Sequence, residues 1–461
     1  PGMAARLDPD ALGDFLSYGY VPFDRCLFSG LRKLPAAHRL VFDASSGRVD
    51  VTPFWKLEPR DVRDDVEEMR ARVEGAVSSH LVSDVPVGAF LSGGLDSSTV
   101  VSRAAPRVPR LPTFTVAYGD GNLDDIHYAR VAAATFATRH HEALLDVGDL
   151  ATTLDRAAQV YDEPLYDSTA LAVLELARIA RAGVKVVLTG DGGDEIFGGY
   201  GWHETVLRYE ALRRGFGPLT PLLAAAHRGL VTPLAATAAG SRLAGAGRLS
   251  AGNFPDRYFP VRGFFTSAEQ QRVCGRAPED AAWLFRKFDR PELPLVQRLL
   301  YLDIATYLPD NNLTLVDRST MAASLEARVP LLDRQLVEYA FSLPPDRLVR
   351  PGATKIAFRE AIRPWLPDAI MARSKSGFSP PFKRWVGGAG REAAFQTLER
   401  GDLAADGVID PRGVRALVQS GTQRRHGKLW LLLNLESWYR RWIRRRAAKE
   451  PRSAAAIAAL A

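Results

Sequence analysis

Short apolar runs alternate with helical patterns between residues 85 and 188, and this alternation constrains the fold more than any other feature. The apolar runs include VPVGAFL, TFTVAY and VKVVLT, which are typical of buried strands. Amphipathic stretches such as HYARVAAATF separate them. Strands that alternate with helices in this way form parallel sheets covered by helices. We therefore predict an α/β fold in which ligands bind beyond the carboxyl ends of the strands.

The flanking regions have different patterns. HRLVFDASSGRVDVTPFW predicts two short strands around a Ser-Ser-Gly turn, so a small β piece precedes the sheet. VEEMRARVEGAVSSHL predicts an amphipathic helix that leads into the first buried strand. Short helices are expected between residues 205 and 262, and mostly helices from Gln297 onward.

Composition excludes several classes of protein. The chain has 461 residues, which is too long for one ordinary core, and 25% of them are charged. Cys26 and Cys274 lie far apart without a C-x-x-C motif, which argues against a disulfide framework or a zinc cluster. The N-terminus has no secretory pattern, and prolines interrupt the most apolar later stretch, residues 218–240. We expect a cytoplasmic protein without a membrane span.

The net charge of +7 is concentrated in YRRWIRRRAAK, residues 439–449. Such runs are usually solvated helix ends, so we favour that interpretation over RNA or membrane binding and expect no nucleic-acid partner.

The loop SGGLDSS, residues 92–98, follows the first buried strand. Gly93 and Gly94 let backbone N–H groups converge on a ligand, and the next helix begins with free N–H groups that suit a phosphate. The hydroxyls of Ser92, Ser97 and Ser98 add donors. Asp96 is useful beside phosphates if a divalent cation lies between them. No lysine follows the glycines, so this is not a Walker loop, and a plain strand-to-helix turn is the competing interpretation.

A second glycine-rich loop, GDGGDEIFGGY at residues 190–200, follows another strand. Both loops are expected on the same edge of the sheet. Asp96 and Asp194 are then predicted to share one Mg²⁺ that bridges phosphate oxygens. The alternative, three acids in a solvated turn, explains Asp191, Asp194 and Glu195 but not the glycines around them.

Five stretches resemble, in the same order, the synthetase domain of glutamine-dependent asparagine synthetases and their relatives. They are SSHLVSDVPVGAFLSGGLDSS, DEPLYDSTAL, LTGDGGDEIFGGY, VDRSTMAASLEARVPLLD and SKSGFSPPFKRW. The resemblance implies a Rossmann-like sheet of the adenine-nucleotide α-hydrolase type over residues 61–445, with a mostly helical C-terminal part. It also implies that residues 1–60 are a remnant of the glutaminase domain and that residues 446–461 are a flexible tail.

The resemblance implies an enzyme that uses ATP to adenylate a side-chain carboxylate, usually that of aspartate, with release of pyrophosphate. Ammonia then forms the amide. Residues 92–98 would hold pyrophosphate, Asp96 and Asp194 would hold Mg²⁺, and Lys375 would lie near the charge at the α-phosphorus. The adenosine would be cradled by the backbone near Phe90, Val116, Thr189 and Gly190.

Two positions depart from the family pattern. Asp191 would lie near the substrate amino acid, where one subgroup of asparagine synthetases has glutamate. Leu315 stands where many relatives have lysine. On local sequence alone, Lys375 also fits an exposed lysine in a turn before Gly377.

Further polar residues are expected around the site. Buried ion pairs that shape the pocket floor are expected among Arg318, Glu326, Arg328 and Asp333. The substrate side is expected to include Tyr161, Asp162 and Glu163, and the following helix cap Asp167 and Ser168.

In this family a terminal cysteine hydrolyses glutamine. Residue 1 here is proline, Cys26 is not terminal, and the chain before Val87 is too short for a glutaminase domain. We therefore expect no glutaminase activity, and a need for free ammonia or a separate glutaminase subunit. A homodimer is also possible.

Three alternatives to the amidoligase stay open. One is an adenylating cyclase or amidotransferase that acts on another carboxylate, as in β-lactam synthetases or lasso-peptide cyclases. Another is an RNA-modifying protein of the pyrophosphatase-loop superfamily, suggested by the basic charge. The last is a non-catalytic binding protein on an enzyme scaffold.

Overall fold

A computed structural model of the chain describes residues 5–118, 123–145, 150–216, 252–374, 386–387, 390–419 and 425–444.

A parallel sheet of five strands forms the centre of the fold, in the order β5-β4-β3-β6-β7. The strands are β3 (Val87–Phe90), β4 (Pro112–Tyr118), β5 (Arg139–Leu145), β6 (Val186–Leu188) and β7 (Glu326–Arg328). The predicted α/β fold is confirmed, although β7 was not foreseen in the sequence. The chain runs outward from β3 through β4 to β5 and then returns to place β6 on the other side of β3. This reversal creates a switch point, where open α/β sheets bind ligands.

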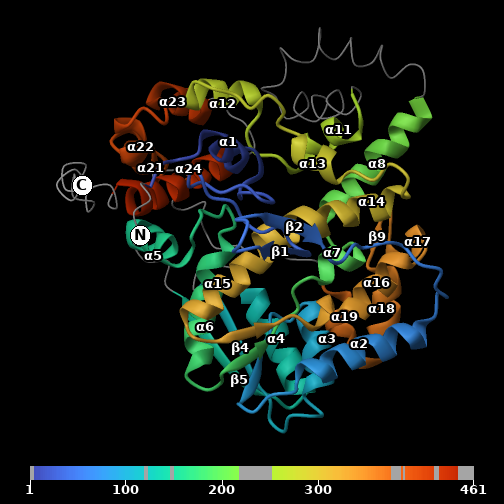
Figure 1. Ribbon diagram of the computed structural model, residues 1–461. Helices are drawn as coiled ribbons and strands as arrows, with labels where there is room; N and C mark the ends of the chain where they lie inside the picture. The colour runs from blue at the N-terminus through green and yellow to red at the C-terminus, as the bar shows by residue number, and fades with distance from the viewer. Residues whose placement is uncertain are drawn as a thin grey trace.

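Helices cover both faces of this sheet (Figure 1). Val186 and Leu188 face one core with α2 (Val66–His80), α3 (Leu95–Ala104) and α4 (Leu123–Thr135). Val187 faces the opposite side, where α6 (Thr169–Arg181) and α15 (Thr314–Ala322) pack against each other. Alternate residues of a strand point to opposite faces, so strands that are apolar throughout are buried on both.

A second core lies beside the sheet and joins the two ends of the described chain. It includes α1 (Pro9–Tyr18), α5 (Leu150–Val160) and α24 (Arg425–Tyr439). Trp430 and Trp438 of α24 are almost completely buried. The run LWLLLNLESWY is apolar on nearly every side of its helix, and such helices are stable only inside a protein.

The N-terminal β piece is confirmed as a hairpin. β1 (His38–Phe42) and β2 (Val49–Pro53) pair antiparallel, with His38 opposite Pro53. The remaining α-helices are α8 (Gly201–Phe216) and shorter ones: α7 (Gly193–Phe197), α11 (Phe254–Arg262), α12 (Ser267–Cys274), α13 (Trp283–Phe288), α14 (Leu295–Leu302), α16 (Arg334–Ser342), α17 (Pro345–Leu348), α18 (Ile356–Ile362), α19 (Asp368–Ala372), α21 (Gly390–Glu399), α22 (Asp402–Ala405) and α23 (Pro411–Gln419). Asp303–Leu313, called the π-helical segment below, and Arg440–Arg444 are π-helical, and Pro330–Leu332 and Arg363–Trp365 are 3-10 helices. β8 (Val349–Arg350) and β9 (Ala353–Thr354) form a small hairpin.

The region between residues 205 and 262 differs in part from expectation. α8 is a helix of 16 residues rather than a short one. Residues 217–251 and the predicted tail at 446–461 lie outside the described residues. Within the described part of the chain, no helix has the length and apolar character needed to cross a membrane.

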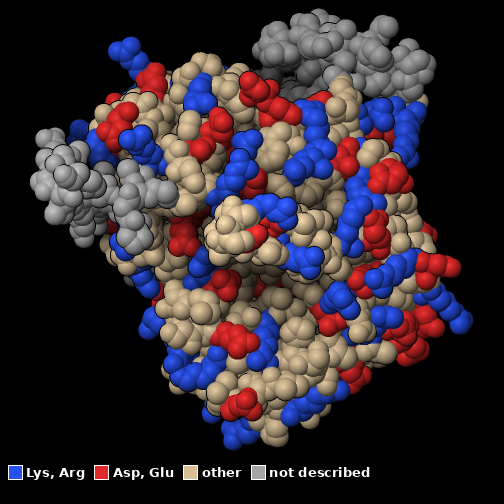
Figure 2. All heavy atoms as spheres, viewed as in Figure 1, with Lys and Arg blue, Asp and Glu red and all other residues tan. Residues whose placement is uncertain are grey.

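Charge on the visible surface is mixed. Lys and Arg side chains alternate with Asp and Glu over the face shown in Figure 2, so basic charge does not gather into one patch on that face. This favours solvated charge over a nucleic-acid surface there.

Candidate active site

The two glycine-rich loops lie against each other at the switch point between β3 and β6. Ala89 pairs with Leu188, so both strands end at the same edge of the sheet. A Cβ atom on Gly190 would lie 2.6 Å from the backbone nitrogen of Ser97, and one on Gly193 would lie 2.7 Å from Cγ of Asp96. Gly190 is therefore required for close approach of the two backbones, and Gly193 leaves room for the Asp96 side chain. The predicted common edge is confirmed.

The first loop turns at Gly93. Its φ is +69°, and a Cβ atom there would lie 2.4 Å from the backbone of Tyr128 and Ala129 in α4. The Ser92 and Ser97 hydroxyl oxygens lie 3.0 Å apart. No side-chain hydrogen bond caps α3 at Gly94, so the helix begins at the loop without a capping side chain. This is the arrangement of a helix N-terminus that binds an anion.

A cavity of about 710 Å³ opens at these loops. Ten of the predicted site residues line it: Phe90, Ser92, Gly94, Asp96, Ser97, Val116, Thr189, Gly190, Asp191 and Asp194. Gly93 and Ser98 are not among its lining residues. Gly93 packs against α4, and Ser98 is fully buried because it lies on the inner face of α3. Lys375 lies outside the described residues.

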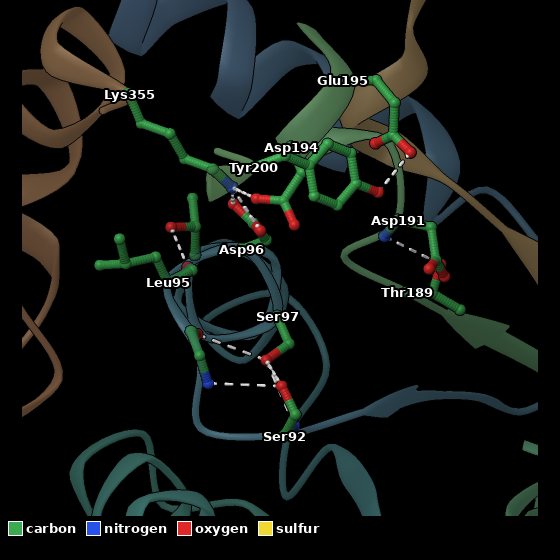
Figure 3. Close-up of polar contacts among 12 residues, drawn as sticks. Ser92, Leu95, Asp96, Ser97, Thr189, Asp191, Asp194, Glu195, Tyr200 and Lys355 are labelled. Carbon is green, nitrogen blue, oxygen red and sulfur yellow. Dashed lines mark hydrogen bonds and ion pairs between the residues drawn. The ribbon is translucent and has the colours of Figure 1, made fainter. Parts of the chain in front are cut away.

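Lys355 joins the two loops, a contact that sequence reasoning missed. Its ammonium nitrogen lies 2.6 Å from both carboxylate oxygens of Asp96 and 2.6 Å from Oδ1 of Asp194 (Figure 3). Burial alone would lower the pKa of this lysine, but the charges of Asp194 and Asp96 outweigh it and raise the pKa. Lys355 immediately precedes α18, and its local sequence, GATKIAFRE, has no feature that indicates this long-range contact.

The two carboxylates fit a role in binding Mg²⁺. Both line the cavity beside the first loop, and carboxylate oxygens are ligands that Mg²⁺ prefers. The described residues contain no group of three or more acidic, histidine or cysteine ligands. Mg²⁺ is commonly held by one or two carboxylates together with substrate phosphates. Asp96 and Asp194 therefore suit a metal that arrives with a phosphorylated substrate.

Two arginines add positive charge near the first loop. Arg373 donates to the Ser92 carbonyl over 2.9 Å and pairs with Asp125. Arg359 also lines the cavity, and burial lowers its pKa. Together with Lys355 they give positive charge to this part of the cavity, formed by residues 92, 94–97, 355, 359 and 373, which we call the phosphate end after the role proposed below.

The other part of the cavity contains acids and aromatic rings. The Tyr200 hydroxyl donates to Glu195 over 2.7 Å, and the Asn312 amide also donates to Glu195. Burial, followed by the charge of Asp194, raises the pKa of Glu195 to about 8. Burial also raises the pKa of Asp191, and the charges of Asp96 and Asp194 add to this effect.

Comparison with known proteins identifies the family. The profile described as asparagine synthase matches residues 68–440, which is most of the chain. The chain belongs to the asparagine synthase family.

Named relatives agree with this assignment. A putative glutamine-hydrolysing asparagine synthetase of Mycobacterium tuberculosis is 29% identical over 95% of this chain and 68% of its own length. The glutamine-hydrolysing asparagine synthetase 1 of Bacillus subtilis is 27% identical over 83% of this chain and 60% of its own length. The amidase chyE of Penicillium rubens is 27% identical over 86% of this chain and 65% of its own length. The resemblance seen in the motifs is confirmed, and the chain is a ligase of the asparagine synthetase type whose family uses ATP as a substrate.

Some predicted neighbours of this asparagine synthase site lie elsewhere. None of residues 161–163 lines the cavity. The Tyr161 hydroxyl contacts Ser319, and the Glu163 carboxylate accepts a hydrogen bond from the backbone N–H of Leu27. Asp167 does line it and accepts from the backbone of Thr169, as expected of a capping residue.

The predicted buried ion pairs of the pocket floor are wrong. Arg318 pairs with Asp162 at the surface, where both side chains are about half exposed. Arg328 pairs with exposed Glu326, and Asp333 caps α16. The cost of burying charge explains why none of these groups is fully buried, while the apolar Val316 of this motif and the preceding Leu315 line the cavity.

Proposed function

We propose that this cavity binds Mg-ATP and a carboxylate, adenylates that carboxylate with release of pyrophosphate, and converts the adenylate to an amide with ammonia. The observation that carries the proposal is the meeting of Asp96, Asp194 and Lys355 beside the uncapped start of α3. Anion-binding N–H groups, two carboxylates for a metal and a buried ammonium group match the needs of a triphosphate.

The proposed chemistry follows from where these groups lie. An oxygen of the acceptor carboxylate attacks the α-phosphorus, and the bond to the β-phosphate oxygen breaks. Residues 92–97, Lys355, Arg359 and Arg373 would hold the leaving pyrophosphate, and Lys375 is proposed to add charge at the α-phosphorus. Mg²⁺, held by Asp96 and Asp194, would neutralise phosphate charge when bound. Fixed charges of this kind lower the barrier because they need no reorganisation during the reaction.

The second step forms the amide. Ammonia attacks the acyl carbon, the bond to the AMP oxygen breaks, and the nitrogen loses one proton. Asp191 lines the cavity, and its raised pKa suits a carboxylate that takes up a proton. Adenosine is proposed to lie against Phe90, Val116, Thr189 and Gly190, which line the same cavity. The names of the relatives make L-aspartate the first acceptor to test.

We propose that ammonia arrives as such or from a glutamine-hydrolysing partner. Cys26 is half-buried and hydrogen-bonded to Glu163, and burial, followed by the Glu163 charge, raises the pKa of its thiol to about 11. A protonated thiol is a poor nucleophile. Glutamine is therefore expected not to replace ammonium chloride as the nitrogen source for the isolated chain.

The first prediction tests the metal and phosphate assignment. Replacing Asp96 with Asn should lower pyrophosphate release from Mg-ATP, acceptor and ammonium by about 100-fold or more, the loss typical when stabilisation of transition-state charge is removed. Asp84→Asn is the matched control, because Asp84 is exposed and does not line the cavity. Equal turnover in both variants, with unchanged thermal unfolding, would overturn the proposed function.

A further inference from the structure

The part of the cavity away from the phosphate end is enclosed by aromatic and aliphatic side chains. Tyr200, Trp202 and Tyr307 line it from the loop after α7, the start of α8 and the π-helical segment, and Leu315 and Val316 line it from α15. We call these five residues the acceptor wall. Of these residues, Tyr200 lies close to Asp194 (Figure 3). The acceptor wall therefore adjoins the carboxylates that are proposed to hold the metal.

The acceptor wall is rigid. The Trp202 ring stacks on Tyr200 with 3.8 Å between ring centroids, and its indole N–H donates to Asp303 over 3.0 Å. The guanidinium of Arg262 lies 3.8 Å from the Trp202 ring and 4.5 Å from the Tyr307 ring. A ring held by stacking, a hydrogen bond and a cation loses little freedom when it binds a ligand. These contacts cover both faces of the Trp202 ring, so the acceptor wall offers a preorganised apolar surface against which an apolar or aromatic group can pack.

Charge around the acceptor wall disfavours an anion. Among the described residues that line the cavity, the cations are Lys355, Arg359 and Arg373, all at the phosphate end. Lys355 and Arg373 already pair with carboxylates. The guanidinium of Arg262 lies behind the aromatic rings, 3.7 Å from Asp303, and is not part of the lining.

The cavity lining also includes the acids Asp167, Asp191 and Glu195, of which Glu195 accepts from the Tyr200 hydroxyl of the acceptor wall. An acceptor that carries only the carboxylate to be activated places that group at the phosphate end, where the cations lie. A second carboxylate on the acceptor would lose water in this part of the cavity without a described cation to pair with, which is costly. An amino group of the acceptor would be favoured.

Resting on the proposed function, we infer that the acceptor carries its reactive carboxylate on a body without a second free carboxylate and with an apolar or aromatic group that packs on the acceptor wall. An aspartyl side chain whose own α-carboxyl group is in amide linkage has this chemistry. Free L-aspartate has the same reactive group but adds the unfavourable anion.

Direct binding tests this inference independently of turnover. The intact chain is saturated with Mg²⁺ and α,β-methylene-ATP, whose α–β linkage cannot be cleaved. Calorimetry then measures the dissociation constants of L-aspartate, the α-amide of L-aspartic acid, and L-aspartyl-L-phenylalanine methyl ester. We expect at least tenfold tighter binding of the α-amide than of L-aspartate, and a further tightening for the dipeptide ester.

Two variants separate charge from packing. Leu315→Lys should tighten binding of L-aspartate by about tenfold, because it brings a cation to the acceptor wall, whereas Leu315→Met should leave the order of affinities unchanged. Trp202→Ala should remove the advantage of the dipeptide ester over the α-amide.

Each outcome has a definite meaning. Binding of L-aspartate as tight as that of the α-amide, or binding of none of the three compounds, overturns the inference. Equal affinities for the α-amide and the dipeptide ester overturn its aromatic part. The expected order of affinities without pyrophosphate release from ATP would instead contradict the proposed function and leave the selectivity of the cavity standing.

Discussion

Lys355 shows how one residue can complete a site built from distant loops. Its side chain is 4% exposed and is paired with two carboxylates, Asp96 and Asp194. Both carboxylates lie within 2.6 Å of one nitrogen, so they are close to each other and would repel if the ammonium were removed. The lysine therefore holds the two loops together when no metal is bound.

This pairing predicts a metal effect that does not depend on activity. Lys355→Met leaves two facing carboxylates and should cost about 3–5 kcal/mol of stability, as expected when one partner of a buried ion pair is removed. Millimolar Mg²⁺ should then raise the melting temperature of this variant more than that of the unchanged protein, because the ion replaces the lost charge.

The control for that experiment is the double variant Asp96→Asn/Lys355→Met, which has a single carboxylate at the site. Its melting temperature should respond to Mg²⁺ no more than that of the unchanged protein. The same Mg²⁺ response in the unchanged protein and in Lys355→Met would contradict a metal shared by Asp96 and Asp194.

At the scale of elements, glycines have opposite roles in the loop and in a helix. Gly93 turns the loop with a positive φ against the backbone of α4. Gly75 lies exposed inside α2, with no atom within 4 Å of the position that a Cβ would take. The loop glycine is needed for its conformation, whereas the helix glycine only adds entropy to the unfolded chain.

We expect opposite signs when each glycine becomes alanine. Gly93→Ala should lower the free energy of unfolding by more than about 1 kcal/mol, because of strain and contact with Tyr128 and Ala129. Gly75→Ala should raise it by about 0.5–1 kcal/mol. Urea unfolding midpoints measure both, and a neutral Gly93→Ala would mean that the loop has another conformation in solution.

Across the whole molecule, the last described helix supports one wall of the cavity. Indole N–H groups of α24 and of the π-helical turn after it (Arg440–Arg444) donate to backbone carbonyls of α5 and of the segment between α5 and α6. Trp442 donates to Ala158 in α5, and Trp438 and Trp430 donate to Asp162 and Tyr166 in the segment after it. The segment held in this way leads directly to Asp167, which lines the cavity. Residues far apart in the chain are therefore coupled through one core.

Hydrogen exchange can test this coupling. Trp438→Ala removes a buried ring that also packs 5.2 Å from Phe28, and should cost about 3–5 kcal/mol. Amides of α5 should then exchange faster together with those of α24, while those of β4 keep their protection. Trp365→Ala is the matched control, because Trp365 packs against the other core. Faster exchange confined to α24 would contradict the coupling.

The sequence predicted those parts of the fold that depend on local patterns of residues. The apolar runs VPVGAFL, TFTVAY and VKVVLT predicted β3, β4 and β6, and the glycines after β3 and β6 predicted that two loops meet at one edge. That Asp96 and Asp194 are neighbours could be predicted because the carboxyl ends of parallel strands meet at the same edge of a sheet. Their proposed roles stay predictions.

Contacts between distant segments were beyond that reasoning. β7 has three residues and no apolar alternation, and it forms only because β6 offers an edge. Ser98 turns inward because α3 packs on the sheet, and Arg318 meets Asp162 at the surface because charged groups avoid an apolar interior.

By itself, then, the sequence determined the alternation of strands and helices, the phosphate-type loops and the family, because these depend on periodicity and short motifs. Only the tertiary structure decided that Lys355 joins Asp96 to Asp194 and that three aromatic rings and two aliphatic side chains form the acceptor wall. Such contacts join segments more than a hundred residues apart, and their positions depend on how whole elements pack rather than on any local preference.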